Sequence, residues 1–90
     1  MNTFQLTCFW ETSDCRSLAR AAKRLHVTRA AVAYQIKSLE QELDVQLLVR
    51  KPRGIELTPA GTCFLEDARH ILALEEQAKD RLDLLRAMEE

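Results

Sequence analysis

The apolar residues between positions 17 and 43 predict two short amphipathic helices joined by a turn at 26–28. In residues 17–25 the apolar positions are spaced i, i+3, i+4 and i+7, which is one face of a helix. In residues 29–43 they are spaced i, i+4, i+7 and i+11, at Val32, Ile36, Leu39 and Leu43. Ser17 and Thr28 precede the two segments and are good N-cap residues. This arrangement is typical of a helix-turn-helix, whose second helix enters the major groove of DNA.

The outward face of the second helix, which we expect at about residues 28–42, carries small and basic side chains. Its candidates for reading base edges are Arg29, Ala30, Ala33, Tyr34, Gln35 and Lys37. Short side chains with cations at their edges would let the helix lie deep in a groove. Two adjacent amphipathic helices are also common in all-α proteins, so this motif alone leaves simple helix packing equally open.

The segments on either side of the motif favour the DNA-binding interpretation. A first helix is expected over about residues 3–13, with Leu6, Phe9, Trp10 and Ser13 on one face and the aromatic rings filling a three-helix core. Aliphatic stretches at 45–50 and 55–57 flank a turn that contains proline and glycine, which predicts a small hairpin. Its basic residues at 50–54 form either a solvated turn or a wing that grips DNA, and we favour the wing.

A long helix is predicted from Pro59 to about Met88, because Thr58 is an N-cap residue and proline suits the first helical position. At 1.5 Å per residue it would be about 45 Å long. An apolar stripe with Glu75 as its one polar interruption follows this helix. Its proposed dimerisation residues are Phe64, Ala68, Ile71, Leu72, Ala78, Leu82 and Leu85. The shorter helices cannot cover such a length, so we expect two copies to pair through it rather than the stripe folding back on its own domain.

The net charge of −1 conceals two segments of opposite sign. Residues 1–61 contain nine basic and six acidic residues, a net charge of +3, whereas residues 62–90 contain four and eight, a net charge of −4. This division predicts a basic head and an acidic arm that faces away from phosphate, with salt-sensitive binding. The expected phosphate and minor-groove contacts are Ser17, Thr28, Arg50, Lys51 and Arg53.

Other classes of function receive little support from the sequence. The three cysteines lack metal-ligand spacing, so we expect no zinc site and no cofactor; Cys8 and Cys63 should pack as small apolar side chains, and a redox role for Cys15 stays open. Catalysis is disfavoured because His26 and His70 lie far apart and no nucleophile accompanies them. Without a signal peptide or an apolar run of about 20 residues, the expected location is the cytoplasm, with no membrane contact.

Taken together, these motifs resemble the N-terminal domain of LysR-type transcriptional regulators. The likeness lies in Ala21–Thr28, in Leu47-Leu48-Val49-Arg50 and in Arg53–Gly61, and it extends over nearly the whole chain. The resemblance implies a mainly α fold: a winged helix-turn-helix with a three-helix core and a hairpin wing over residues 1–58, followed by a linker helix over 59–90 that forms a homodimer. It further implies a pseudo-palindromic double-stranded DNA operator, and a tetramer in a full-length protein, whose effector-binding domain lies outside these 90 residues.

The sequence departs from the family on its reading face. Arg29 stands where glutamine is frequent, Ala30 where proline or serine is common, and Ala33 where serine is common. Tyr34 replaces a small polar or basic residue and is expected to donate to a phosphate or to a base edge, with both alternatives open. The competing hypothesis, motivated by the negative net charge, is a protein-interaction module in which the long helix is the working part.

Overall fold

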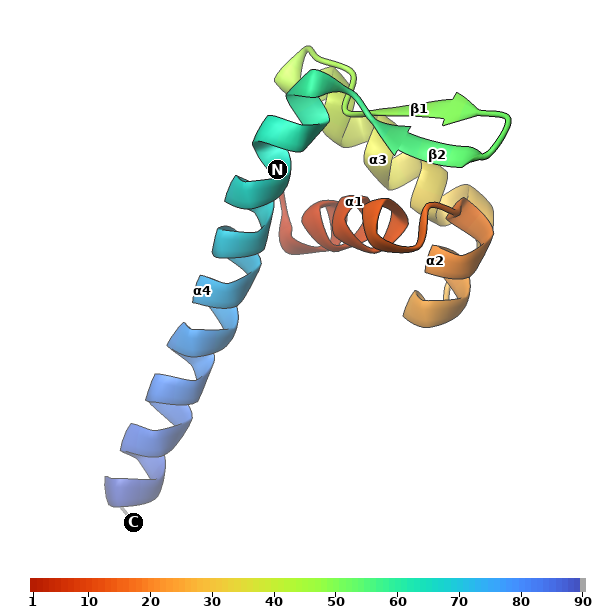
Figure 1. Cartoon of the computed structure of the whole chain (residues 1–90). Helices are drawn as coiled ribbons and strands as arrows, with labels where there is room; N and C mark the ends of the chain where they lie inside the picture. The colour runs from red at the N-terminus through yellow and green to blue at the C-terminus, as the bar shows by residue number, and fades with distance from the viewer. Residues whose placement is uncertain (90) are drawn as a thin grey trace.

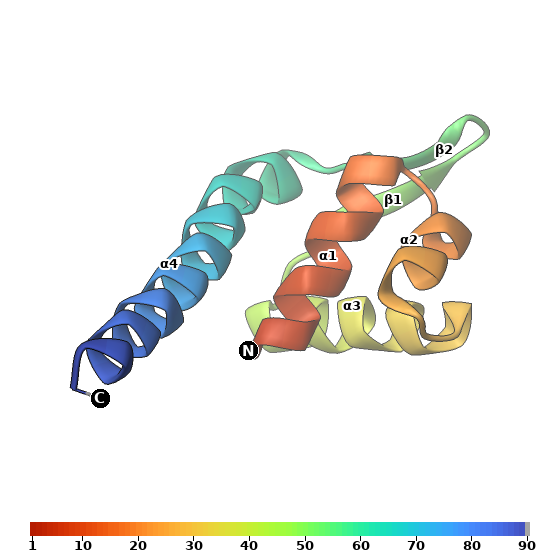
Figure 2. The same ribbon diagram turned by 90° about the horizontal axis from the view of Figure 1, so that it is seen from below.

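The computed structural model describes residues 1–89 as five short elements and one long helix (Figure 1). The elements in chain order are α1 (Thr3–Cys15), α2 (Leu18–Leu25), α3 (Arg29–Leu43), β1 (Leu48–Lys51), β2 (Gly54–Leu57) and α4 (Pro59–Glu89). Helices α1 to α3 form a bundle, the hairpin lies beside the end of α1 and the turn into α2, and α4 projects away as an arm (Figures 1 and 2). The predicted winged helix-turn-helix with a long C-terminal helix is therefore confirmed.

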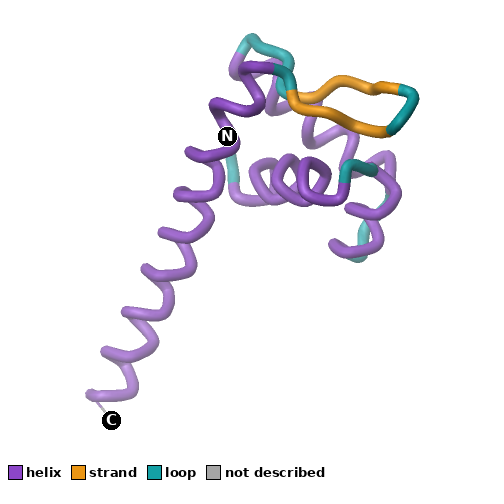
Figure 3. The backbone as a smooth tube through the Cα atoms, in the orientation of Figure 1, coloured by secondary structure: helices purple, strands orange, loops and turns teal. Residues whose placement is uncertain are grey.

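Side-chain caps fix where the helices begin, as the sequence predicted. The Ser17 hydroxyl accepts a hydrogen bond from the Arg20 amide at 3.1 Å, and the Thr28 hydroxyl accepts one from the Ala31 amide at 3.0 Å. Thr58 caps α4 in the same way, its hydroxyl accepting from the Gly61 amide at 2.9 Å. Each cap satisfies an amide that the first helical turn would otherwise leave unpaired. The capping residues therefore fix where the short loops shown in Figure 3 end and the next helix begins.

The core lies between α1 and α3, with the two alanines of α2 closing one side. Its largest fully buried side chains are Phe9, Leu6, Leu39, Leu47 and Val32. The face predicted for α1 was partly wrong. Cys8 and Thr12 are fully buried, whereas Trp10 and Ser13 are only half-buried. The buried face of α1 differs from the predicted one because both α3 and α4 pack against this helix. Together they bury a wider part of its circumference than one partner helix would.

The hairpin is a two-stranded antiparallel sheet with Leu48 opposite Leu57 and Lys51 opposite Gly54. Only residues 52–53 form its turn, and the first strand begins at Leu48 rather than at residue 45. Val45 is exposed in the loop between α3 and the strand. A hairpin this small needs tertiary support, because two strands alone are marginal in water.

Helix α4 packs against α1 only along its first half. Ala68 is fully buried, and the rings of Phe9 and Phe64 lie 5.7 Å apart between centroids. The Thr3 hydroxyl donates a hydrogen bond to the Glu75 carboxylate at 2.6 Å. The expectation that the stripe does not fold back on its own domain was thus wrong for its first half, because α1 runs alongside the first four turns of α4. Within this chain Ala68 has no free surface to offer a second copy.

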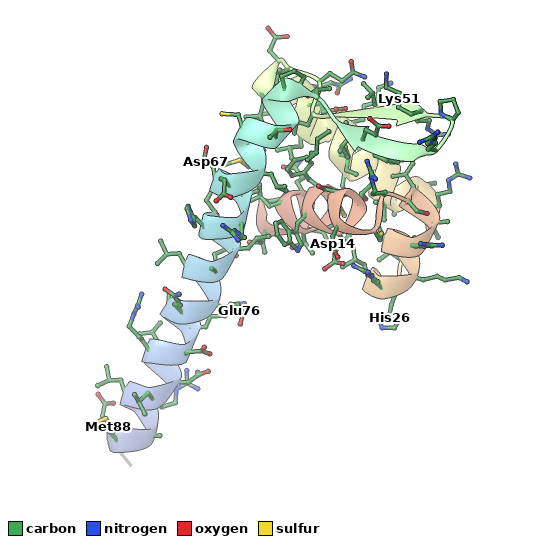
Figure 4. The ribbon with its side chains drawn as sticks, viewed as in Figure 1. Asp14, His26, Lys51, Asp67, Glu76 and Met88 are labelled. Carbon is green, nitrogen blue, oxygen red and sulfur yellow. The ribbon has the colours of Figure 1, made fainter. Side chains whose placement is uncertain are left out.

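Beyond Glu75 the arm has no cover from its own chain. Leu82 is 63% exposed and Leu85 is 52% exposed, and neighbouring large apolar side chains are exposed as well: Leu74, Leu84 and Met88. Figure 4 shows Met88 near the far end of α4, well away from Lys51 on the hairpin. The described helices include none long and apolar enough to cross a membrane.

The cysteines differ in burial. Cys8 is fully buried, as expected, and burial raises the pKa of its thiol to about 11. Cys63 was predicted to pack inside but is exposed on α4, because the covered face of that helix passes through Phe64 and Ala68 instead. Cys15 is half-buried at the end of α1, and its thiol donates to the Glu11 carbonyl at 3.0 Å.

Candidate nucleic-acid interface

The outward face of α3 carries most of the residues predicted to read bases. Arg29, Ala30, Tyr34 and Lys37 are exposed, and Ala33 is half-buried at the edge toward the hairpin. The opposite face of α3 holds Val32, Ile36 and Leu39 in the core, so this side must face outward. Gln35 differs from the others, since it is half-buried and lies about 100° around the helix from Tyr34. It flanks the face rather than standing on it.

A basic groove lies between the α1–α2 turn, the start of α3 and the hairpin. It has a volume of about 670 Å³, and six basic residues with no acidic one line it among the residues described: Arg16, Arg20, Arg29, Arg50, Lys51 and Arg53. Ser17 also lines it, whereas Thr28 does not. We call this space the basic groove. Concentrated positive charge of this kind attracts a polyanion and binds it in a salt-dependent manner.

Arg16 and Arg20 were not among the contacts predicted from the sequence. The signal was available, because Arg16 precedes the N-cap Ser17 and Arg20 lies one helical turn after it. Residues around a helix N-terminus share the side where unpaired amides point outward. Only the folded chain brings that terminus next to the hairpin arginines.

A second, smaller groove of about 280 Å³ continues the basic groove along α3. Leu18, Arg50 and Ile55 line both spaces, so the two grooves adjoin at these residues. Lys37 on α3 and Arg50 on β1 supply its basic side chains, Glu40 supplies an acidic one, and most of its other lining residues are apolar. The two grooves form one track between the recognition helix and the hairpin. A single strand of sugar and phosphate fits such a track chemically, with cations for the phosphates and apolar surface for the sugars.

One backbone hydrogen bond holds the hairpin against the α1–α2 turn. The Ile55 amide donates to the Arg16 carbonyl at 3.1 Å. Arg16 ends α1 in the left-handed conformation, with φ of 57°, which turns its carbonyl toward the hairpin. Gly54 has φ of +123°, and an added Cβ would lie 2.9 Å from that carbonyl oxygen. Glycine is therefore required at the point where the hairpin approaches the turn.

Glu40 fixes the other end of the hairpin to α3. Its Oε2 atom accepts hydrogen bonds from the amides of Leu47 at 2.7 Å and Leu48 at 3.2 Å. Both leucines are buried, so water cannot readily replace the carboxylate as their partner. The recognition helix and the first strand are thereby held in one orientation. The sequence offered no signal for this contact, because it joins residues seven and eight positions apart across a loop.

Not every basic residue of the head belongs to this interface. The Arg24 guanidinium forms ion pairs with Asp14 at 2.8 Å and with Glu11 at 3.0 Å. Hydrogen bonds first to Asp14 and then to Glu11 raise the pKa of Arg24 above its usual value. Arg24 therefore links α2 to α1, and neither groove includes it. Figure 4 likewise separates Asp67 and Glu76 on α4 from Lys51, so the acidic arm lies away from the basic groove.

Comparison with known proteins identifies relatives of this arrangement. Residues 4–62 match the family model described as bacterial regulatory helix-turn-helix protein, lysR family. The regulator TcbR of Pseudomonas sp. strain P51 is 49% identical over 77 residues, which are 86% of this chain and 26% of TcbR. ClcR of Pseudomonas putida is 44% identical over the same number of residues and with the same coverage. The chain thus spans about a quarter of the length of these two relatives.

Solved structures of similar proteins have the same fold. The crystal structure of a CbnR_DBD–DNA complex has a TM-score of 0.89 and 45% sequence identity, and it covers 96% of this chain and 99% of that chain. The BenM_DBD complex with catB site 1 DNA has a TM-score of 0.92 at 29% identity, with 96% of this chain and 97% of that chain covered. Both of these similar structures contain DNA.

Proposed function

Because the chain belongs to the lysR family of bacterial regulatory helix-turn-helix proteins, we propose that it binds double-stranded DNA sequence-specifically and regulates transcription. The observation that carries this proposal is the basic groove beside the exposed face of α3. A face of small side chains suits base edges, and a cationic groove suits the adjacent backbone. Its DNA-bound structural relatives support the same conclusion.

In the proposed complex, α3 enters the major groove from its N-terminal end. Ala30 and Ala33 allow close approach, and Arg29 pairs with O6 and N7 of a guanine, a contact that contributes about 1–3 kcal/mol of discrimination. The hydroxyls of Ser17 and Thr28 accept from amides and keep a proton to donate to phosphate. These contacts lie at helix N-termini, where the dipole favours an anion.

The hairpin acts as a wing in this proposal. Arg50, Lys51 and Arg53 are exposed on it, next to the track described above. They contact the backbone or enter the minor groove, and they fix the register of the protein on the duplex. Because such contacts carry little sequence information, they supply affinity rather than discrimination.

The arm pairs two copies into a homodimer that presents two heads to a pseudo-palindromic operator. The exposed stripe supports this, since Ala78, Leu82 and Leu85 have no cover from their own chain. Phe64, Ile71 and Leu72 are half-buried against the core, so only the exposed part of each side chain can contact a second copy. We divide the chain into a reading domain at 1–58 and a linker helix from 59 onward. We further propose that it acts as a transcriptional regulator, as the relatives are named, and that it does so in the cytoplasm and not as an enzyme.

Site selection from random duplexes, followed by anisotropy titrations at two salt concentrations, tests the proposal. Arg29→Ala should relax the preference at one base pair, whereas Arg53→Ala should weaken binding to all sequences and reduce the salt slope by about 1. Lys23→Ala is the matched control, because Lys23 is exposed on α2 and lines neither groove. Absence of binding even at about 50 mM salt would contradict the proposal and favour a protein-interaction module.

A further inference from the structure

Tyr34 is the most exposed of the large hydrophobic side chains in residues 1–58. It is 69% exposed on α3, and its hydroxyl forms none of the hydrogen bonds found among the described residues. The core does not explain its presence, because the ring contributes nothing to the packing between α1 and α3. The residue matters here because of its position on the helix.

The surroundings of Tyr34 on the outward face are unusually small. One turn before it stands Ala30, and Ala31 and Ala33 flank it, so its neighbours in the first two turns end in methyl groups. The aromatic ring of Tyr34 therefore projects further from the helix axis than these alanine side chains. If α3 enters a groove, the tyrosine ring reaches further than any neighbour on the central line of the face.

The position of Tyr34 also separates it from the backbone track. Ala33 and Lys37 line the smaller groove and Arg29 lines the basic groove, whereas Tyr34 lines neither. Arg29, Ala33 and Lys37 therefore lie at the border between the outward face and the track, whereas Tyr34 lies on the outward face alone. A group on the outward line of a recognition helix faces base edges instead.

We propose that Tyr34 is a specificity-determining residue that reads a thymine by packing its ring against the 5-methyl group in the major groove. This inference rests on the proposed function. The thymine methyl is the apolar feature of the major groove, and apolar side chains contact it. Together with Ala30 and Ala33, the ring gives this chain a largely apolar reading face, bordered by the cations Arg29 and Lys37.

Replacing single thymines with deoxyuracil in a selected duplex tests the inference, because the exchange removes only the methyl group. Burial of one methyl contributes about 0.8 kcal/mol, so wild-type protein should lose about fourfold in affinity at one thymine of each half-site. Tyr34→Phe should keep that loss, because it keeps the ring. Tyr34→Ala should bind the thymine and uracil duplexes equally, which gives a double-mutant cycle.

A phosphate contact by the hydroxyl is the alternative, and it would overturn the inference. Tyr34→Phe and Tyr34→Ala would then weaken all duplexes alike, with no position sensitive to uracil. Gln41→Ala is the matched control, since Gln41 is exposed two turns further along α3 and should leave the uracil effect unchanged. Wild-type protein that binds specifically without any uracil-sensitive thymine would refute this inference alone. Wild-type protein that shows no sequence preference would overturn the proposed function as well.

Discussion

Replacing Glu40 with alanine is expected to lower the free energy of unfolding by about 3 kcal/mol. The substitution removes the acceptor for two amides at once, those of Leu47 and Leu48. A hydrogen bond to a charged group contributes about 1.5–3 kcal/mol, and a buried donor left unpaired costs about 1–3 kcal/mol. For two bonds the hydrogen-bond figure alone gives about 3–6 kcal/mol, and we take its lower end because both hydrogen bonds are only partly buried, which reduces the cost of an unpaired donor.

Thermal unfolding followed by circular dichroism at fixed protein concentration measures this effect. For a chain of this size each 1 kcal/mol shifts Tm by about 4–8 °C, so Glu40→Ala should lower Tm by about 12–24 °C. Glu40→Gln keeps an oxygen acceptor without its charge and should lose roughly half as much, because charge-assisted bonds are about twice as strong as neutral ones.

The control is Gln41→Ala, which changes an exposed neighbour on the same helix and should shift stability by less than about 0.5 kcal/mol. A Glu40→Ala protein as stable as this control would refute the reasoning, since the carboxylate would then not hold the strand. Operator binding should fall along with stability in Glu40→Ala, because the wing loses its fixed orientation to α3.

Three further outcomes are expected. Gly61→Ala should lower Tm by several degrees, because the added Cβ would collide with the Leu47 carbonyl. The collision costs about 1–3 kcal/mol, whereas the gain in helix propensity is at most about 1 kcal/mol. An unchanged Tm would show that α4 can shift. Thr12→Val should raise stability by about 1 kcal/mol in urea unfolding, because the buried hydroxyl has no partner among the described residues; destabilisation would indicate that solvent pairs it. At pH 8, iodoacetamide should modify the exposed Cys63 in the native protein. It should modify Cys8 only after unfolding, because Cys8 is buried and its thiol pKa is raised to about 11. Equal labelling of the two cysteines by mass spectrometry would contradict the burial of Cys8.

The candidate interface shows how far local patterns reach. The residues that the helical period placed on the outward side of α3 are found there, apart from Gln35 on its flank. The hairpin arginines also lie beside that helix. The roles of three other arginines could not be predicted from local patterns. Arg16 and Arg20 line the basic groove, whereas Arg24 forms ion pairs with α1.

By itself, the sequence determined where the elements begin and which side of α3 faces inward. Caps such as Ser17 and Thr28 act within three residues, and helical periodicity acts within two turns, so both can be read from neighbouring positions. The long helix could be predicted for the same reason, because nothing between Pro59 and the described end interrupts it.

Only the tertiary structure decided which parts of those surfaces remain free. Ala68 and Ala78 look equivalent in the sequence, yet Ala68 is fully buried and Ala78 is exposed, because α1 runs beside the first turns of α4 and ends there. The bond from Ile55 to the Arg16 carbonyl joins residues 39 positions apart. Such contacts depend on where whole elements dock, and docking is set by the shape of the complete core rather than by any local pattern.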